Sequence, residues 1–288
     1  MPGTLYIVAT PIGNLEDITL RALRILKEAD LVAAEDTRHT LKLLAHFEIT
    51  TPLISFHQHS DTDRADHLVY KIAEEGKSVA LVTDAGTPGV SDPGVELVRA
   101  AIAAGVTVVP IPGASAVLSA LVGSGLPPAR FAFEGFLPRT KSDRREKLAA
   151  FAAEETRTLV FYEAPNRTRE TLTDMRDIFG ADRPAAVGRE LTKKFEEFVR
   201  GPLGDVLAHF TKNEARGEIT IVVAGRDAAT VTAPDEIELS PEERMLAALR
   251  ACLEAGVSER DAVRQVSMDL KLSKRDVYAA ALALKNEA

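Results

Sequence analysis

The stretch SVALVTDAGTPGVSDPG, residues 78–94, indicates the fold class, because a short apolar run is followed by a loop dense in Gly, Pro, Asp and Ser. Similar β-branched runs alternate with amphipathic stretches of helix length from Thr4 to about Pro128. This alternation is typical of a mostly parallel sheet covered by helices. The expected strands are residues 5–9, 31–35, 52–56, 78–83 and 106–111, and the expected helices are 18–29, 37–46, 61–75, 94–104 and 115–123.

Turn residues interrupt the alternation at SGLPPARFAFEGFLPR, residues 124–139, which we interpret as the passage into a second domain. Beyond it we expect strands at 130–136, 158–163, 184–190, 196–201 and 218–225, and helices at 141–153, 166–179 and 202–210. The expected organisation is an α/β domain over residues 1–125, a second α/β domain over 126–228, a linker over 229–239 and a helical domain over 240–288.

The last part of the chain is expected to be all helical, because its apolar residues recur every three or four positions. Ser258 and Ser273 stand where N-caps of two helices belong. A helix-turn-helix-like bundle is one interpretation. The sequence leaves open whether these helices contact RNA, because Lys274 and Arg275 are their only clear basic pair and small bundles also serve as caps or dimer contacts.

The composition excludes several classes of protein. The chain has 288 residues, of which 45% are hydrophobic, and no run approaches the roughly 18 apolar residues of a membrane span. We therefore expect a soluble cytoplasmic protein with no membrane partner. The single cysteine, Cys252, allows neither an internal disulfide nor a cysteine zinc site, so no metal is expected. The net charge of −8 excludes nucleic-acid binding through the whole surface and requires a local basic patch.

Three motifs follow expected strands: VATPIGN at residues 8–14, LVTDAGTPGVSDPG at 81–94 and VVPIPGASAVLSAL at 108–121. Each alone is compatible with an ordinary turn or a capped helix start. Together they place exposed backbone groups at the carboxyl edge of a sheet, which suits an adenosine-containing ligand. None is a GxGxxG or Walker sequence, so neither a dinucleotide fingerprint nor a phosphate loop is indicated.

The order of further motifs resembles the ribosomal RNA small subunit 2′-O-methyltransferase family. After PIGN come AEDTR at 34–38, TDAGTPGVSDPG, PGAS, FEGFLPR, FYEAPNR at 161–167 and GRELTKKFEE at 188–197, and the similarity covers about residues 4–225. The resemblance implies a two-domain tetrapyrrole-methylase-like fold with a small C-terminal helical domain. It also implies a homodimer, S-adenosyl-L-methionine bound between the two α/β domains, and methylation of a cytidine 2′-hydroxyl in 16S ribosomal RNA of the small subunit.

Carried over position by position, the resemblance implies a set of cofactor-binding residues. These are Pro11, Asp84, Ala85, Gly86, Thr87, Pro88, Val90, Ser115 and Ala116 from the first domain, and Tyr162, Leu191 and Thr220 from the second.

A ribose hydroxyl is a poor nucleophile until its proton is removed or strongly hydrogen-bonded. The expected catalytic residues are Glu163 in YEAPNR and Glu190 with Lys193 in GRELTKK. Charged residues after strands also serve as helix caps or ion-pair partners, and Arg167 and Arg189 are near enough in sequence to supply such partners.

The strongest basic cluster is PRTKSDRREK, residues 138–147, and we expect it to bind RNA phosphates. The expected RNA-binding residues are Arg139, Lys141, Arg144, Arg145 and Arg167. The alternative is a solvated helix face. Two other functions stay open at this point: a small-molecule (tetrapyrrole) methyltransferase, and a non-catalytic ribosome- or RNA-binding protein.

Overall fold

The computed structural model describes residues 3–56, 62–154, 156–226, 245–246, 248–250, 252, 257–270 and 272–286. The chain divides into two compact units, Met1–Ala229 and Thr230–Ala288. The predicted linker at residues 229–239 lies outside the described residues.

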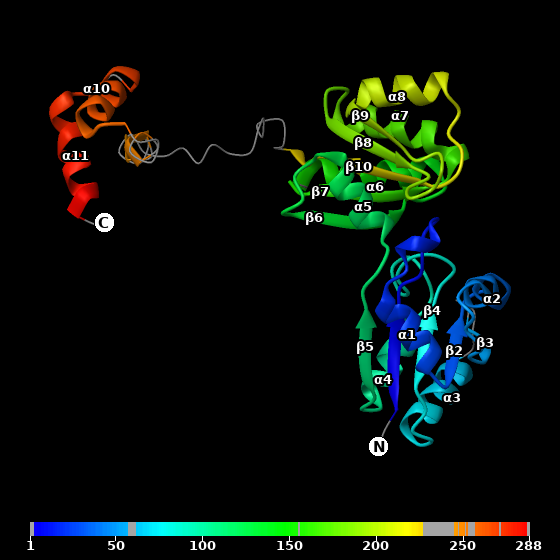
Figure 1. The fold of residues 1–288 in the computed structure, drawn as a ribbon. Coiled ribbons are helices and arrows are strands. Elements are labelled where there is room, and N and C mark those ends of the chain that lie inside the picture. Colours follow the sequence, from blue (N-terminus) through cyan, green and yellow to red (C-terminus); the bar gives the residue numbers. More distant parts are fainter. Residues whose placement is uncertain are drawn as a thin grey trace. The chain divides into compact units, whose positions relative to one another are not determined.

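The first sheet of the larger unit consists of five parallel strands in the order β3-β2-β4-β1-β5 (Figure 1). The strands are β1 Thr4–Val8, β2 Leu31–Ala34, β3 Leu53–Ser55, β4 Val79–Val82 and β5 Thr107–Ile111. They are connected through the 3-10 turn η1 Leu15–Asp17 and the helices α1 Leu20–Glu28, α2 Thr37–His46, α3 Thr62–Ala73 and α4 Val95–Ala103. All five carboxyl ends therefore lie at the same edge, where ligands bind in open α/β sheets.

The central strand β4 is buried on both faces of this sheet. Val79 and Leu81 pack with α3 and α4, whereas Ala80 and Val82 pack with α1 and α2. Strands covered on both faces become continuous apolar runs, as VALV is here. The prediction of an α/β layer with helices on a mostly parallel sheet is confirmed.

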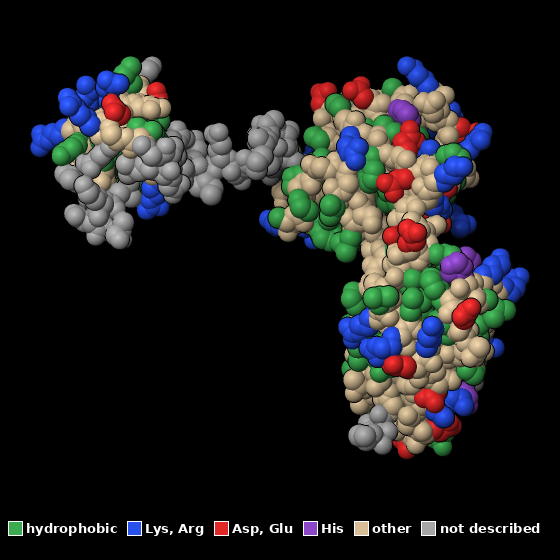
Figure 2. All heavy atoms as spheres, in the orientation of Figure 1, with side chains coloured by type: hydrophobic (Ala, Val, Ile, Leu, Met, Phe, Trp, Pro, Cys, Tyr) green, Lys and Arg blue, Asp and Glu red, His purple; other side chains and the backbone are tan. Residues whose placement is uncertain are grey.

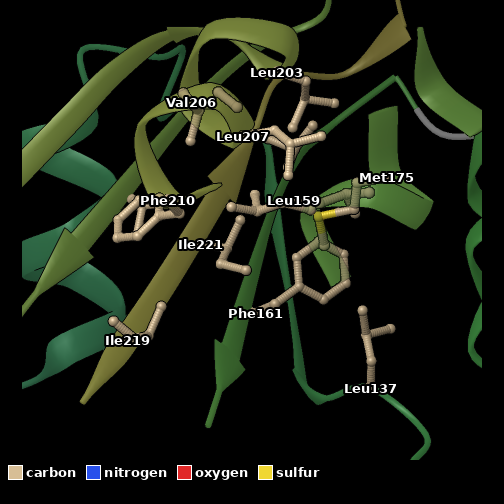
Figure 3. Packing of buried hydrophobic residues seen from close by; sticks show 14 of the residues in the cluster. Leu137, Leu159, Phe161, Met175, Leu203, Val206, Leu207, Phe210, Ile219 and Ile221 are labelled. Carbon is tan, nitrogen blue, oxygen red and sulfur yellow. The ribbon is translucent and has the colours of Figure 1, made fainter. Parts of the chain in front are cut away.

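The second sheet has the order β6-β7-β10-β8-β9 and is mixed. Only β6 and β7 pair in parallel, and the other neighbours are antiparallel. Its strands are β6 Phe131–Phe136, β7 Thr158–Glu163, β8 Pro184–Arg189, β9 Glu197–Pro202 and β10 Ile219–Val223. The connecting elements are α6 Lys141–Glu154, the 3-10 turn η2 Pro165–Arg167, α7 Thr168–Phe179 and α8 Leu203–Lys212. Figure 3 shows the core between this sheet and its helices, with Phe161 and Ile221 beside Leu207 of α8 and Met175 of α7.

Helix α5, Ala116–Ser124, follows β5 of the first sheet but packs against the second sheet. Val117, Ala120 and Leu121 form a cluster with Val160 and Val222 of β7 and β10. The chain therefore passes from one sheet to the other before α5, whereas the sequence places the corresponding helix in the first domain. The domain boundaries stay a prediction.

The smaller unit contains α10 Glu259–Asp269 and α11 Lys274–Asn286. The hydroxyl of Ser258 accepts a hydrogen bond from the Asp261 amide, and that of Ser273 accepts one from the Asp276 amide. Both serines thus cap helices where the sequence places N-caps. Within the described parts of the chain, no helix is long and apolar enough to cross a membrane.

Candidate functional site

A cavity of about 360 Å³ lies where loops from the two sheets of the larger unit meet. The first sheet contributes the segments after β1, β4 and β5, and the second contributes the ends of β6 and β7 and the turn before β10. The lining residues are Ile12, Ala85, Gly86, Thr87, Val90, Ser91, Asp92, Ser115, Ala116, Phe136, Tyr162, Glu163, Ala164, Pro165, Gly217, Glu218, Ile219 and Thr220. A volume of this size suits one small organic ligand.

The loop after β4 owes its shape to glycines with left-handed backbone. Gly86, Gly89 and Gly94 have φ angles of +84°, +83° and +135°. Gly86 also exchanges two backbone hydrogen bonds with Thr10, at 2.9 and 3.0 Å, which join this loop to the VATPIGN loop. Residues that carry a side chain are strained at positive φ angles. Glycines at these positions therefore allow the backbone itself to form the cavity wall.

Most of the predicted cofactor-binding residues lie together. The members that line the cavity are Ala85, Gly86, Thr87, Val90, Ser115, Ala116, Tyr162 and Thr220. Ser115 is also the N-cap of α5, because its hydroxyl accepts a hydrogen bond from the Leu118 amide at 3.4 Å. Leu191 is buried in the same apolar cluster as Ile12, and Pro88 is buried too; neither Leu191 nor Pro88 is part of the lining.

Two aromatic side chains, Phe136 and Tyr162, line the cavity, and Phe133 packs against Tyr162. The ring of Tyr162 lies 4.8 Å from that of Phe133 and 5.7 Å from that of Phe136, measured between centroids. Burial, with a smaller effect of the nearby Asp92 charge, raises the pKa of Tyr162 to about 12. Tyr162 is therefore a neutral apolar surface with a hydroxyl donor at physiological pH.

Asp92 is one of the lining residues that the sequence did not single out, although it belongs to the SDPG end of the quoted motif. Burial, followed by the charges of Glu35 and Asp84, raises its pKa to about 6. Burial also raises the pKa of Glu35, and the charges of Asp84 and Asp36 add to this, although a hydrogen bond from the Asp84 amide acts in the opposite direction. The edge of the first sheet thus concentrates carboxyl groups at the cavity.

Glu163 was expected to be catalytic, but its carboxylate is fully enclosed. It accepts hydrogen bonds from the Ala164 amide at 2.8 Å and the Thr171 hydroxyl at 2.6 Å, and the Arg167 guanidinium lies 3.4 Å away. These partners join the end of β7 to α7, and Glu163 also belongs to the cavity lining. Its catalytic role stays a prediction.

Glu190 and Lys193 form an ion pair at 2.7 Å, and Lys193 also contacts Glu218 at 3.1 Å. The hydrogen bond from Lys193 lowers the pKa of Glu190. Burial lowers the pKa of Lys193, but its hydrogen bonds to both glutamates outweigh burial, so the pKa is raised. Both groups are charged near neutral pH. A side chain at Gly13 would collide with Lys193, so this ion pair abuts the VATPIGN loop, and its catalytic role stays a prediction.

The predicted RNA-binding cluster requires a correction. Arg144 is 2% exposed and donates a hydrogen bond to Asp174 at 2.8 Å, so it cannot contact a phosphate. Arg145 also binds Asp174, at 2.8 Å, and contacts Asp177. Arg167 donates to the carbonyls of Leu137 and Pro138. These arginines hold α6, α7 and the β6–α6 loop together, and an RNA contact of Arg145 or Arg167 stays a prediction.

Two members of that cluster, Arg139 and Lys141, are exposed, as an RNA contact requires. Their role stays a prediction.

A second cavity, of about 210 Å³, lies at the same edge of the first sheet. Its lining consists of Thr10, Pro11, Leu15, His39, Thr40, Lys42, Leu43, Thr83 and Asp84. Pro11 and Asp84, which the sequence assigns to the cofactor, therefore line this smaller cavity. Within the described ranges no cluster of His, Cys, Asp and Glu could hold a metal ion.

Comparison with known proteins places this geometry in context. The sequence model of the tetrapyrrole (corrin/porphyrin) methylase family matches residues 4–207. The chain is 47% identical over 283 residues to the ribosomal RNA small subunit methyltransferase I of Synechocystis, covering 98% of this chain and 99% of that protein. It is 43% identical over 284 residues to the protein of the same name from Bacillus subtilis, covering 96% and 94%.

Among solved structures, a uroporphyrin-III C-methyltransferase from Thermus thermophilus complexed with S-adenosyl homocysteine is similar in fold. The TM-score is 0.52 at 24% identity, and the match covers 77% of this chain and 97% of that protein.

Proposed function

Since the chain belongs to the tetrapyrrole (corrin/porphyrin) methylase family, we propose that it is an S-adenosyl-L-methionine-dependent methyltransferase acting on 16S ribosomal RNA of the small ribosomal subunit. The modified group is the ribose 2′-hydroxyl of a cytidine. The observation that carries this proposal is identity of 47% over almost the whole length of a ribosomal RNA small subunit methyltransferase I. A tetrapyrrole methyltransferase and a non-catalytic RNA-binding protein are the alternatives that the experiment below separates.

The larger cavity fits the cofactor in shape and charge. Its glycine-rich wall brings Ala85, Gly86 and Thr87 to the cavity. The Gly86 N–H and C=O are paired with Thr10, but the Ala85 and Thr87 amides have no acceptor among the described residues and suit the polar edges of an adenosine. Asp92, with Glu35 and Asp84 near it, gives the site a negative potential that favours a cationic sulfonium. When bound, the cofactor supplies an activated methyl group, so the protein has mainly to align the acceptor and exclude water.

The hydroxyl proton needs an acceptor, and we propose Asp92 for this role in place of Glu163. A general base works best when its pKa lies near the working pH. Asp92 lines the cavity and has a pKa of about 6, whereas the carboxylate of Glu163 is enclosed. Tyr162 lies near Asp92, is neutral at this pH, and lines the cavity on the side of the second sheet.

The activity is tested with small ribosomal subunits from cells that lack the protein. Incubation with S-adenosylmethionine labelled in the methyl group is expected to transfer label to 16S RNA, and nuclease digestion should release a 2′-O-methylcytidine. Label on an added tetrapyrrole instead would favour the small-molecule alternative. Binding to subunits without any transfer would favour the non-catalytic one.

We also propose that the protein acts as a homodimer in the cytoplasm, where small subunits are assembled. Leu118 and Val122 lie one turn apart on α5 and are 52% and 75% exposed, which is unusual for apolar side chains on a helix that packs on a sheet. Sedimentation of the purified protein is expected to give twice the chain mass of 31.1 kDa. A species with the mass of one chain would refute the dimer.

A further inference from the structure

The smaller cavity has the composition of a nucleotide site. Its walls include the apolar side chains of Pro11, Leu15 and Leu43, against which the face of a base can pack. Its volume is about 210 Å³, against about 360 Å³ for the larger cavity.

The two cavities share a wall made of two short loops. After β1, Thr10 and Pro11 line the smaller cavity and Ile12 lines the larger one. After β4, residues 83–84 line the smaller cavity and residues 85–87 line the larger one. The bridge between Thr10 and Gly86 joins these loops. Ligands in the two cavities are therefore neighbours, as a donor and an acceptor must be.

Two side chains of α2 that can carry positive charge line the smaller cavity. His39 and Lys42 belong to its lining and are exposed, and Figure 2 shows histidine and basic side chains gathered over α2. Within the parts of the chain that the structure describes, neither side chain has an ion-pair partner. Arg144 and Arg145 of α6, in contrast, are engaged by Asp174. Lys42 is thus available for a phosphate, and Arg144 is not.

Asp84 supplies a hydrogen-bond acceptor in the same cavity. One of its carboxylate oxygens accepts the Asp36 amide at 3.1 Å, which fixes the side chain. A carboxylate is the side chain that reads the exocyclic amine of cytosine, because uracil presents a carbonyl oxygen at that position. Asp84 also influences the pKa of Asp92, so the acceptor cavity adjoins the proposed proton acceptor.

We propose that the smaller cavity binds the acceptor nucleotide of the RNA, with its base against Pro11, Leu15 and Leu43 and an adjoining phosphate on Lys42 and His39. This inference rests on the proposed function, since it assigns a binding site, the smaller cavity, to the substrate of that reaction.

The test replaces Lys42 by Ala and compares this variant with Lys27→Ala and Lys42→Arg. Lys27 is exposed in the last turn of α1, which leads into the amino end of β2 and so lies at the opposite edge of the sheet. Initial rates of methyl transfer are measured against the concentration of unmethylated small subunits at several salt concentrations. Calorimetric titration measures the affinity of S-adenosylhomocysteine for the larger cavity.

Loss of one phosphate contact should raise KM for subunits on the order of tenfold and reduce the slope of log KM against log salt by about 0.7. Lys42→Arg should restore most of the affinity because it keeps the charge, and Lys27→Ala should match the wild type. S-adenosylhomocysteine affinity should be equal in all four proteins.

A KM and salt slope for Lys42→Ala equal to those of the wild type would overturn this inference and leave the proposed function standing. Equal losses in Lys27→Ala and Lys42→Ala would also overturn it, because they would indicate a general effect of charge. Absence of transfer by the wild type would overturn the proposed function as well.

Discussion

At the scale of single residues, the environment of Asp92 sets its chemistry. A carboxyl group in water has a pKa near 4, but burial and the charges of Glu35 and Asp84 raise the pKa of Asp92 to about 6. The group is still ionised at pH 7.5 and binds a proton more readily than an exposed aspartate would. That combination is what a proton acceptor for a ribose hydroxyl needs.

Replacing Asp92 by Asn should lower kcat on the order of a hundredfold while S-adenosylhomocysteine affinity is retained. For the wild type, kcat should rise as the pH passes about 6, because ionisation produces the proton-accepting form, and level off above it. The variant should lack this rise. Glu218→Gln, which changes a 71% exposed carboxylate of the same cavity, should keep it. An Asp92→Asn enzyme with the wild-type rate and pH profile would exclude Asp92.

Replacing Arg144 by Ala should reduce the free energy of unfolding by about 3 kcal/mol, because it leaves the buried Asp174 carboxylate with only Arg145 as a partner. Lys141→Ala, on the exposed start of the same helix, should change it by less than about 0.5 kcal/mol. Urea unfolding measures both. Equal stability of the two variants would contradict the structural role of Arg144.

The sequence could not reveal that role. The ion-pair partner Asp174 lies 30 positions away, and a run of charges followed by small residues has the pattern of a solvated helix. The role of Asp92, in contrast, could have been predicted, because Asp92 belongs to the motif at residues 81–94 that the sequence identifies as a ligand loop.

At the scale of elements, the local sequence pattern predicted the ends of helices and strands correctly where tertiary packing favours the same structure. The helix Thr37–His46 and the strand Thr158–Glu163 begin and end where apolar spacing and turn residues place them. The packing of α5 on the second sheet was not predictable, because an apolar helix face does not indicate which sheet covers it. The same holds for the antiparallel pairing of β8, β9 and β10, which depends on partners distant in sequence.

The loop after β4 is the element on which the larger cavity depends. Gly86→Val should abolish cofactor binding, because a β-branched residue at φ +84° costs at least about 1–2 kcal/mol and distorts the bridge to Thr10. Gly105→Val is the matched control: its φ is +72°, no atom lies within 4 Å of the added Cβ, and it is remote from the cavity. Titration calorimetry should show binding only by the control, and binding by both would contradict this role.

At the scale of the whole molecule, neither sheet alone completes the larger cavity. Residues 85–87, 90–92 and 115–116 follow strands of the first sheet, and residues 162–165 and 217–220 belong to the second sheet and its turns. The sequence located the first group through its glycine-rich loops. It offered no local sign that the turn at Gly217 would complete the site, because that turn reaches the cavity only through the pairing of β10 with β7 and β8.

The most direct measurement is a crystal structure of the protein with S-adenosylhomocysteine at a saturating concentration. The ligand is expected in the larger cavity, in contact with the backbone of residues 85–87 and with Ser115, Tyr162 and Thr220, while the smaller cavity stays free for the acceptor. Ligand density at another place, or an empty cavity under these conditions, would contradict it.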